Sequence, residues 1–359
     1  MAAYYALMAS AAVIGRLYDQ SVNFLFASSG PVRVGGHPIY MIGGTEYKVS
    51  PDGGSPEAVR LSNEFRSEIN AMPWMTYRNG FEPIPSPQCQ ASTEHDEAGT
   101  AGASVCSLRN GNSAVSGFTS DSGWGCTLRT TQMMTANAMI RNAKRLNTFT
   151  PETEASILSR FADSFSSPLS IHNMIKQSKG IAGKWFGPSQ AGWAIAELAK
   201  PYIATYVAMD GGISHRTVKD LLDKSAGKGL LVYVPVRLAM DTWISVTEHK
   251  RAILGLFQHV PQFVGFVGGD VTQSYYFVAA SDDYLYIMDP HTTQTSIESV
   301  TADNKAKVVP SQPGVMAMRW PRLTSTMMYG FLLHSIEDLD AMAKALKAVG
   351  PSVGFGLTK

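Results

Sequence analysis

The chain has 359 residues, of which 45% are hydrophobic and only 16% are charged, and its 30 basic residues nearly balance its 29 acidic residues. Because charged residues usually make up about a quarter of a domain, this composition predicts a globular protein with a large buried core. A net charge of +1 without a long basic run excludes the electrostatic surface of a nucleic-acid-binding protein, so no nucleic-acid partner is expected.

The most apolar stretch near the start of the chain covers residues 4–15, YYALMASAAVIG. It is shorter than the roughly 20 apolar residues that span a bilayer, and it lacks the basic residues of a secretory signal. We therefore expect a packed helix, with no transmembrane segment. Cys89, Cys106 and Cys126 are an odd set without a CxxC pair, which predicts neither disulfides nor a zinc site and favours a cytoplasmic location.

The next part of the chain predicts a mainly helical lobe over residues 31–228. The segment TPETEASILSRF begins with a threonine cap, a proline and acidic residues, as helices do. Helical spacing is kept by the apolar residues Leu61, Phe65, Ile69 and Met72. Further helices are expected over residues 190–200, with Ser189 as the cap, and over residues 215–224.

Within this lobe, residues 85–117 are rich in Ser, Gly, Ala, Asn and Gln and nearly free of large apolar residues. Such a segment buries too little surface to offset its ordering entropy, so we expect a flexible insertion. Cys89, His95 and Cys106 fall inside it, which favours a solvated loop over a metal site.

Later in the chain, strand-like apolar runs predict a β-rich lobe over residues 229–335. A Ser-Asp-Asp cluster at residues 281–283 separates two alternating runs and predicts a hairpin turn. A helix over residues 246–259 interrupts the strands, and residues 336–359 are expected to form a C-terminal helix and tail. Helices followed by strands, without a regular βαβ repeat, predict an α+β fold in a single domain, residues 1–359.

A cysteine follows Gly-Trp-Gly in the segment SDSGWGCTLRTTQMM, residues 120–134. We expect Asp121 or Ser122 to cap a helix whose first turn contains Cys126. The partial positive charge of a helix N-terminus favours a thiolate, the reactive form of cysteine, and the flanking glycines allow backbone and substrate to approach closely. A buried structural thiol is the alternative, because free cysteine usually behaves as a small hydrophobic residue.

One of the eight histidines, His291 in the segment IMDPHTTQ, lies in a context that suits a base. In an extended chain Asp289 and His291 point to one face, about 6.6 Å apart, and Pro290 places the pair at a sheet edge or strand end. Asp289 is then positioned to orient the imidazole. The alternative is an ordinary turn in which Asp289 makes only a local backbone contact.

Other chemistries find no support in the sequence. The segment GIAGKWFG has too few residues between its glycines for a nucleotide-binding loop, and Trp185 stands where Ser or Thr must follow the lysine. Neither HExxH nor GxSxG occurs. We therefore expect no metal and no organic cofactor.

Taken together, the segments around Cys126 and His291 resemble those of the autophagin family, the autophagy-related cysteine peptidases. The segments PWMTYRNGFEPI, GKWFGPSQAGWAI and GFVGGDVTQSYYFV are similar to further motifs of this family and follow in the same order. The resemblance implies a papain-like cysteine peptidase fold, with a helical lobe, a β-sheet lobe and an active site between them.

The resemblance also implies a reaction, which is cleavage after the C-terminal glycine of a ubiquitin-like autophagy modifier and removal of phosphatidylethanolamine from its lipidated form. The implied partners are this modifier and its phosphatidylethanolamine conjugate, with peripheral membrane contact through the substrate. The alternatives are a catalytically silent module that binds the modifier, and a papain-like enzyme that catalyses another acyl transfer.

By motif, Cys126 resembles the nucleophile, His291 the base and Asp289 the residue that orients this base. Tyr77 resembles a tyrosine whose hydroxyl helps to stabilise the oxyanion. The alternative for Tyr77 is an ordinary core aromatic residue.

Two further motif matches concern the cover of the cleft. Trp185 resembles one wall, and the segment Gly268, Gly269 and Asp270 resembles a loop that forms the other. A slot closed by an indole admits only residues without side chains, which would explain the selection of glycine. The alternatives are a core tryptophan and a tight turn.

Overall fold

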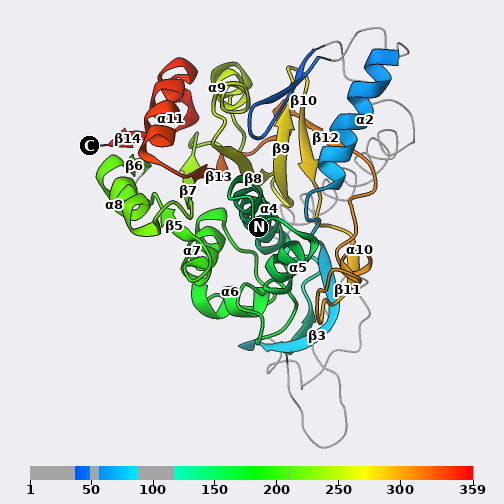
Figure 1. Cartoon of the computed structure of the whole chain (residues 1–359). Helices are drawn as coiled ribbons and strands as arrows, with labels where there is room; N and C mark the ends of the chain where they lie inside the picture. The colour runs from blue at the N-terminus through cyan, green and yellow to red at the C-terminus, as the bar shows by residue number, and fades with distance from the viewer. Residues whose placement is uncertain (1–36, 49–55, 88–116, 210, 359) are drawn as a thin grey trace, which may run out of the picture.

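The computed structural model describes residues 37–48, 56–87, 117–209 and 211–358. The expected helix over residues 4–15 and the expected insertion, apart from its two ends, lie outside the described residues. The described chain forms the expected α+β fold, in which helices pack on both faces of a large sheet and two small sheets lie beside it (Figure 1).

The described helices are α2 (Pro56–Asn70), α4 (Cys126–Arg145), α5 (Pro151–Ser159), α6 (Ile171–Ser178), α7 (Pro188–Ala199), α8 (His215–Ser225), α9 (Val246–His259), α10 (Lys305–Val308) and α11 (Ile336–Val349). The strands are β1 (Ile39–Met41), β2 (Thr45–Tyr47), β3 (Tyr77–Pro85), β4 (Gly117–Ser120), β5 (Ala204–Val207), β6 (Gly212–Ser214), β7 (Leu230–Arg237), β8 (Phe263–Gly269), β9 (Ser274–Ala280), β10 (Tyr284–Met288), β11 (Thr293–Thr295), β12 (Met316–Arg319), β13 (Thr326–Leu333) and β14 (Gly356–Thr358).

The large sheet has the strand order β12-β10-β9-β8-β13-β7-β5, and β1 joins it by pairing with β9 and with β2. Neighbouring strands are antiparallel, except that β5 runs parallel to β7. Strand β13, TMMYGFLL, lies inside the sheet, and all of its residues after the first are buried. A continuous apolar run of this length is typical of a strand covered on both faces.

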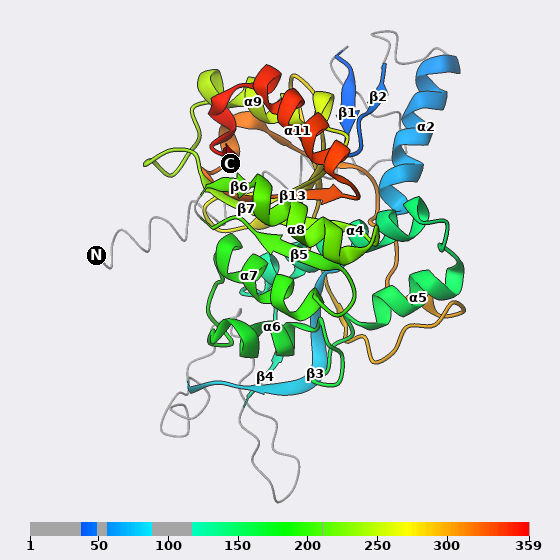
Figure 2. The same cartoon turned by 60° about the vertical axis from the view of Figure 1, so that its left-hand side comes forward.

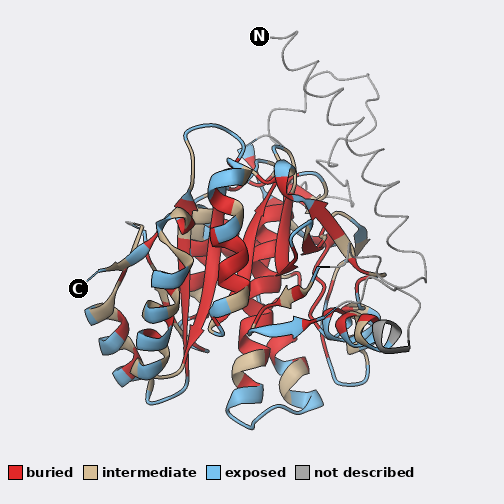
Figure 3. Cartoon of the chain, turned by 90° about the horizontal axis from the view of Figure 1, so that it is seen from above, coloured by how far each residue is buried: buried red, intermediate tan, exposed pale blue. Residues whose placement is uncertain are grey.

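Helices provide that cover. On one face, Met134 of α4 lies beside Gly330, and Gly192 of α7 lies beside Met328. Helices α9 and α11 lie on the other face, as Figure 2 shows from the side. Figure 3 shows that the buried residues are concentrated in the strands and in the inward sides of the helices. The core is therefore a single sheet enclosed between two layers of helices.

Helix α4 runs through the interior, and residues 126–140 are all buried. Its hydroxyl groups bond within the helix: Oγ1 of Thr131 donates to the carbonyl of Thr127 at 2.7 Å, and Oγ1 of Thr135 donates to that of Thr131 at 2.8 Å. Because a buried polar group without a partner is costly, these bonds allow a helix rich in threonine to occupy the centre of the protein. Cys126 is thereby fixed at the start of an enclosed helix.

A three-stranded sheet, β11-β3-β4, brings distant parts of the chain together. Strand β3 is parallel to β11, where Tyr77 pairs with Thr293, and antiparallel to β4. Strand β4 ends shortly before Cys126, and β11 begins shortly after His291. This small sheet therefore holds the chain that leads into Cys126 beside the chain that leaves His291.

Most of the expected elements are confirmed. Helix α5 follows Thr150, whose hydroxyl accepts the N–H of Thr153, and the turn at residues 281–283 joins β9 to β10. The expected cap at Ser189 is wrong, because α7 begins at Pro188, whose fixed φ suits the first helical position.

The division into lobes at residues 31–228 and 229–335 stays a prediction, and the large sheet takes β1, β2 and β5 from the first of these ranges. Among the described helices, none is long and apolar enough to cross a membrane.

The close packing of α4 on β13 predicts that Gly330→Ala destabilises the protein. A Cβ at Gly330 would lie 2.8 Å from Cγ2 of Val264 and 2.9 Å from Sδ of Met134. Overpacking of this kind costs about 1–3 kcal/mol of unfolding free energy, which urea denaturation measures. The control is Gly356→Ala, at a strand glycine whose Cβ would meet nothing within 4 Å, and it should change this free energy by less than about 0.5 kcal/mol. Equal effects of the two substitutions would contradict the packing argument.

Candidate active site

Cys126 is the first residue of α4, and only 5% of it is exposed. The N-cap residue is Gly125 and no side chain caps the helix, so the expected cap by Asp121 or Ser122 is wrong. The reason is that the carboxylate of Asp121 is bound to Nε of Arg129 at 2.7 Å. Because no side-chain oxygen caps this helix N-terminus, its partial positive charge acts directly on the thiol.

The two glycines before Cys126 have separate structural causes. Gly123 has a φ of +84°, which residues other than glycine rarely adopt. A Cβ at Gly125 would lie 2.5 Å from Oδ2 of Asp121. The group that approaches Gly125 closely is therefore this carboxylate rather than a substrate.

Asp289 and His291 follow the end of β10, as expected, and contact each other directly. Nδ1 of His291 lies 2.5 Å from Oδ1 of Asp289, and the backbone N–H of His291 donates to the same oxygen at 2.9 Å. Both interpretations of this segment therefore apply, because Asp289 accepts a local backbone N–H and also orients the imidazole. The backbone of Asp289 is held by Oε1 of Gln312 and by Nε1 of Trp74, each at 2.7 Å.

Two tyrosines flank the imidazole of His291. The ring centroids of Tyr77 and Tyr275 lie 5.4 Å and 5.3 Å from that of His291, both in edge-to-face geometry. Nε2 of His291 is buried and has no hydrogen-bond partner in the described chain apart from its interaction with Cys126. Nε2 of His291 therefore interacts with the thiol of Cys126 and with no other described group.

The thiol and the imidazole change each other's pKa. Burial alone raises the pKa of Cys126, but interaction with His291, together with the N–H of Ser274 and the hydroxyl of Tyr77, lowers it below its ordinary value. Burial alone lowers the pKa of His291, but hydrogen bonds to Asp289 and to Cys126 raise it to about 9. Between the two pKa values the pair exists as thiolate and imidazolium, which is the form of an activated cysteine nucleophile.

Tyr77 presents a hydroxyl that stays protonated beside the sulfur. Burial, together with the charge on Cys126, raises the pKa of Tyr77 well above its ordinary value. Protonated hydroxyls and backbone N–H groups, such as that of Cys126, are the donors that stabilise an oxyanion in acyl transfer. The described ranges contain no group of three or more His, Cys, Asp or Glu side chains that could hold a metal ion.

A cavity of about 410 Å³ opens beside Cys126. Its lining contains the four expected cleft residues, Trp185, Gly268, Gly269 and Asp270, but not His291, Asp289 or Tyr77. The indole of Trp185 is 60% exposed, and its Nε1 donates to the carbonyl of Gly123 at 2.7 Å. Trp185 is therefore not a core residue, and it stands next to the segment that leads into Cys126.

The opposite wall differs from the expected loop. Gly268 and Gly269 are the last residues of β8, and the turn begins at Asp270. The N–H of Asp270 donates to the carbonyl of Gln273 at 3.0 Å, and its carboxylate lies 2.8 Å from Nη2 of Arg322. A Cβ at Gly269 would lie 1.9 Å from the carbonyl oxygen of Gln273, so this tight turn requires glycine.

Sequence reasoning missed several residues that support the site. Tyr275 and Gln312 come from distant segments, and no local pattern marks either of them. Arg129 had a usable signal, because it lies three residues after Cys126 and so shares a helix face with it. An arginine on a face that is to be buried requires acidic partners, and it has one in Asp121.

Comparison with known proteins places this site in a family. Residues 62–345 match the family model of the peptidase C54 catalytic domain. The chain is 32% identical over 312 residues to cysteine protease atg4 of Emericella nidulans, which covers 80% of this chain and 72% of that protein. It is 33% identical over 333 residues to cysteine protease ATG4 of Pyricularia oryzae, which covers 84% of this chain and 63% of that protein.

The family match spans Tyr77, Cys126, Trp185, Asp289 and His291, and it covers most of the described residues. The α+β architecture is that of the papain-like cysteine peptidases to which this family belongs. The protein is a cysteine peptidase of the peptidase C54 family, the autophagin family that its motifs resemble.

Proposed function

We propose that this peptidase cleaves after the C-terminal glycine of a ubiquitin-like autophagy modifier and removes phosphatidylethanolamine from the lipidated modifier. Membership of the family supports the substrate class. The observation that carries the chemistry is the pairing, beside a cavity, of a buried thiol of lowered pKa with an imidazole of raised pKa. Both reactions expel an amine from the carbonyl of the same glycine, so one site serves both.

The reaction begins with attack of the Cys126 thiolate on the glycine carbonyl carbon. The new S–C bond displaces the π electrons onto oxygen, and the hydroxyl of Tyr77 and the backbone N–H of Cys126 stabilise the oxyanion. The imidazolium of His291 gives its proton to the leaving amine as the C–N bond breaks. A water molecule, deprotonated by His291, then hydrolyses the thioester, while Asp289 keeps the imidazole in place.

The partners follow from this chemistry. The protein substrate is the modifier, and its phosphatidylethanolamine conjugate brings the enzyme to a membrane surface through the substrate. A reducing cytoplasm suits the reaction, because oxidation of the thiolate would remove the nucleophile.

Cys126→Ala is expected to abolish removal of a C-terminal extension from the modifier, measured by gel shift under reducing conditions. His291→Ala should slow it by about 10²–10⁴-fold, because it removes the general base and acid. Cys106→Ala, outside the described residues, is the matched control and should cleave as the wild type does. Cleavage by Cys126→Ala would place the nucleophile elsewhere. Tight binding without cleavage by the wild type would favour a silent binding module.

The two pKa shifts predict a bell-shaped pH dependence of cleavage. As the pH falls through the lowered pKa of Cys126 the thiolate is protonated, and as the pH rises through about 9 His291 loses the proton that the leaving amine needs. Alkylation of Cys126 by iodoacetamide, followed on its peptide by mass spectrometry, needs only the thiolate and should decline on the acid side alone.

Asp289→Asn provides the comparison for this profile. It keeps an acceptor for Nδ1 but removes the negative charge that helps to raise the pKa of His291, so the alkaline limb of cleavage should move to lower pH and the acid limb of alkylation to higher pH. Identical profiles for wild type and Asp289→Asn would contradict the role of Asp289.

Trp185→Ala should relax the selection for glycine. With the indole present, a side chain on the residue at the thiol meets an aromatic wall. Discrimination between a modifier ending in glycine and one ending in alanine should therefore fall about tenfold or more in the variant, as ratios of kcat/KM. The control is Trp193→Ala, at a half-exposed tryptophan of α7 that does not line the cavity. Unchanged discrimination in Trp185→Ala would remove the indole from substrate selection.

A further inference from the structure

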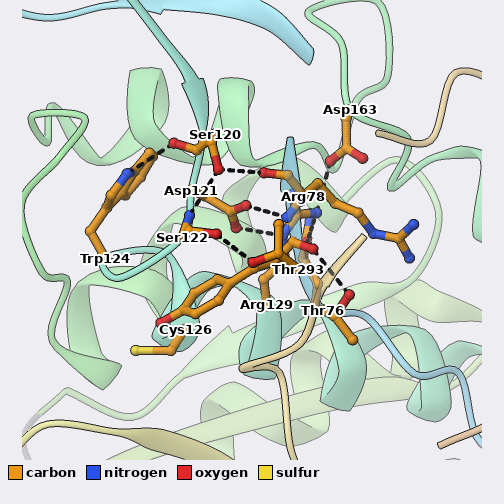
Figure 4. Close-up of polar contacts among 12 residues, drawn as sticks. Thr76, Arg78, Ser120, Asp121, Ser122, Trp124, Cys126, Arg129, Asp163 and Thr293 are labelled. Atoms are coloured by element: carbon orange, nitrogen blue, oxygen red, sulfur yellow. Dashed lines mark hydrogen bonds and ion pairs between the residues drawn. The ribbon is translucent and has the colours of Figure 1, made fainter. Parts of the chain in front are cut away.

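A network of buried charges lies between the segment that carries Cys126 and the segment that carries His291. Its members are Arg78, Asp121, Arg129 and Asp163, none of which is more than 4% exposed. Nε of Arg129 lies 2.7 Å from Oδ2 of Asp121, and its Nη1 lies 2.8 Å from Oδ1 of Asp163. In Figure 4 the network lies beside the chain leading into Cys126, whose thiol points away from it.

On the thiol side, the network fixes the turn before α4. The carboxylate of Asp121 accepts the backbone N–H of Arg78 at 2.6 Å, and its backbone carbonyl accepts the N–H groups of Trp124 at 3.2 Å and Gly125 at 2.9 Å. Arg129 belongs to the first turns of α4 itself. The contact of Asp121 with Arg129 therefore clamps this turn onto the helix that Cys126 begins.

On the imidazole side, the network fixes the chain that leaves His291. The N–H of Ile297 donates to Oδ2 of Asp163 at 2.7 Å, and the N–H of Asp163 donates to the carbonyl of Ile297 at 2.7 Å. Nη1 of Arg78 donates to the carbonyl of Thr295 at 2.8 Å. One buried cluster thus binds both of the segments whose side chains must meet.

Stability alone does not explain this network. Nε and Nη2 of Arg78 and Nη2 of Arg129 are buried without a hydrogen bond in the described part of the chain. Burial of paired charges is costly, and apolar residues in their place often make a protein more stable. Buried charges with unsatisfied donors are expected where a functional site must be held in position, even at a cost in stability.

We propose that Arg129 and Asp163 are positioning residues, which set the separation between Sγ of Cys126 and Nε2 of His291. Arg129 acts on the thiol side through Asp121, and Asp163 acts on the imidazole side through Ile297. The inference rests on the proposed function, because it takes Cys126 and His291 as the reacting pair.

The test is Asp163→Asn, which keeps the shape of the side chain and an acceptor for Ile297 but removes the charge opposite Arg129. A misplacement of about 1 Å can cost on the order of 10²-fold in rate, so kcat for cleavage of the modifier should fall about 10- to 100-fold. KM should stay within about twofold, because the cavity lining is unchanged. The acid limb of Cys126 alkylation should move to higher pH, because a displaced His291 stabilises the thiolate less well.

Two further variants keep the test decisive. Arg129→Lys retains the charge but cannot reach both carboxylates as a planar guanidinium does, and it should show the same loss of kcat even if Asp163→Asn does not fold. Leu339→Ala, at a fully buried position of α11, lowers stability without touching the network. Its kcat and alkylation profile should match the wild type at temperatures where circular dichroism shows it folded.

The outcomes separate the two proposals. Unchanged kcat and an unchanged alkylation profile in either folded network variant would overturn the positioning role, as would an equal loss in Leu339→Ala. Failure of the wild type to cleave the modifier would overturn the proposed function instead. The alkylation profile needs no modifier, so it would still decide whether the network positions His291 against Cys126.

Discussion

The contact between Asp289 and Nδ1 of His291 is the interaction on which the site depends. Burial favours the neutral forms of both the thiol and the imidazole. Hydrogen bonds to the carboxylate of Asp289 and to Cys126 reverse this for His291 and raise its pKa to about 9. The imidazolium in turn stabilises the thiolate of Cys126. The reactivity of Cys126 thus depends on the hydrogen bond between Asp289 and His291, which the cysteine itself does not make and which lies after the end of β10.

The rest of the fold encloses these groups, so that Cys126 is buried and the side chains of Asp289 and His291 are mostly covered. Helix α4 is enclosed between the large sheet and the neighbouring helices, so the charge at its N-terminus is little screened by water. The strand pairing of β3 with β11 and the charge network both join the two halves of the site. Glycines occur where backbone or carboxylate atoms leave no room for a Cβ, as at Gly125 and Gly269. The packing around the site therefore fixes the positions of its residues as well as stabilising the fold.

Features with a local cause could be predicted from the sequence. The proline and acidic residues after Thr150 start a helix, and the spacing of Asp289 and His291, two positions apart around a proline, predicted that an extended chain would place their side chains on one face. Features with a distant cause could not. Asp121 had the composition of a helix cap, but Arg129 and the backbone of Arg78 compete for its carboxylate, and this competition exists only in the folded protein. Tyr275, one of the two tyrosines that flank His291, likewise comes from a segment that only the fold brings to the site, whereas Tyr77 was expected at the site from its motif.

The long reach of the Arg78 bond to Thr295 has a consequence for synthesis of the protein. The two residues are 217 positions apart in the chain, and contacts between such distant residues form late, because a large loop must close first. During translation, His291, whose imidazole activates Cys126, is also added to the chain long after Cys126. A nascent chain that has not yet reached His291 therefore carries an ordinary thiol, and the nucleophile acquires its reactivity only after the segment with Asp289 and His291 has been made and has folded against Cys126.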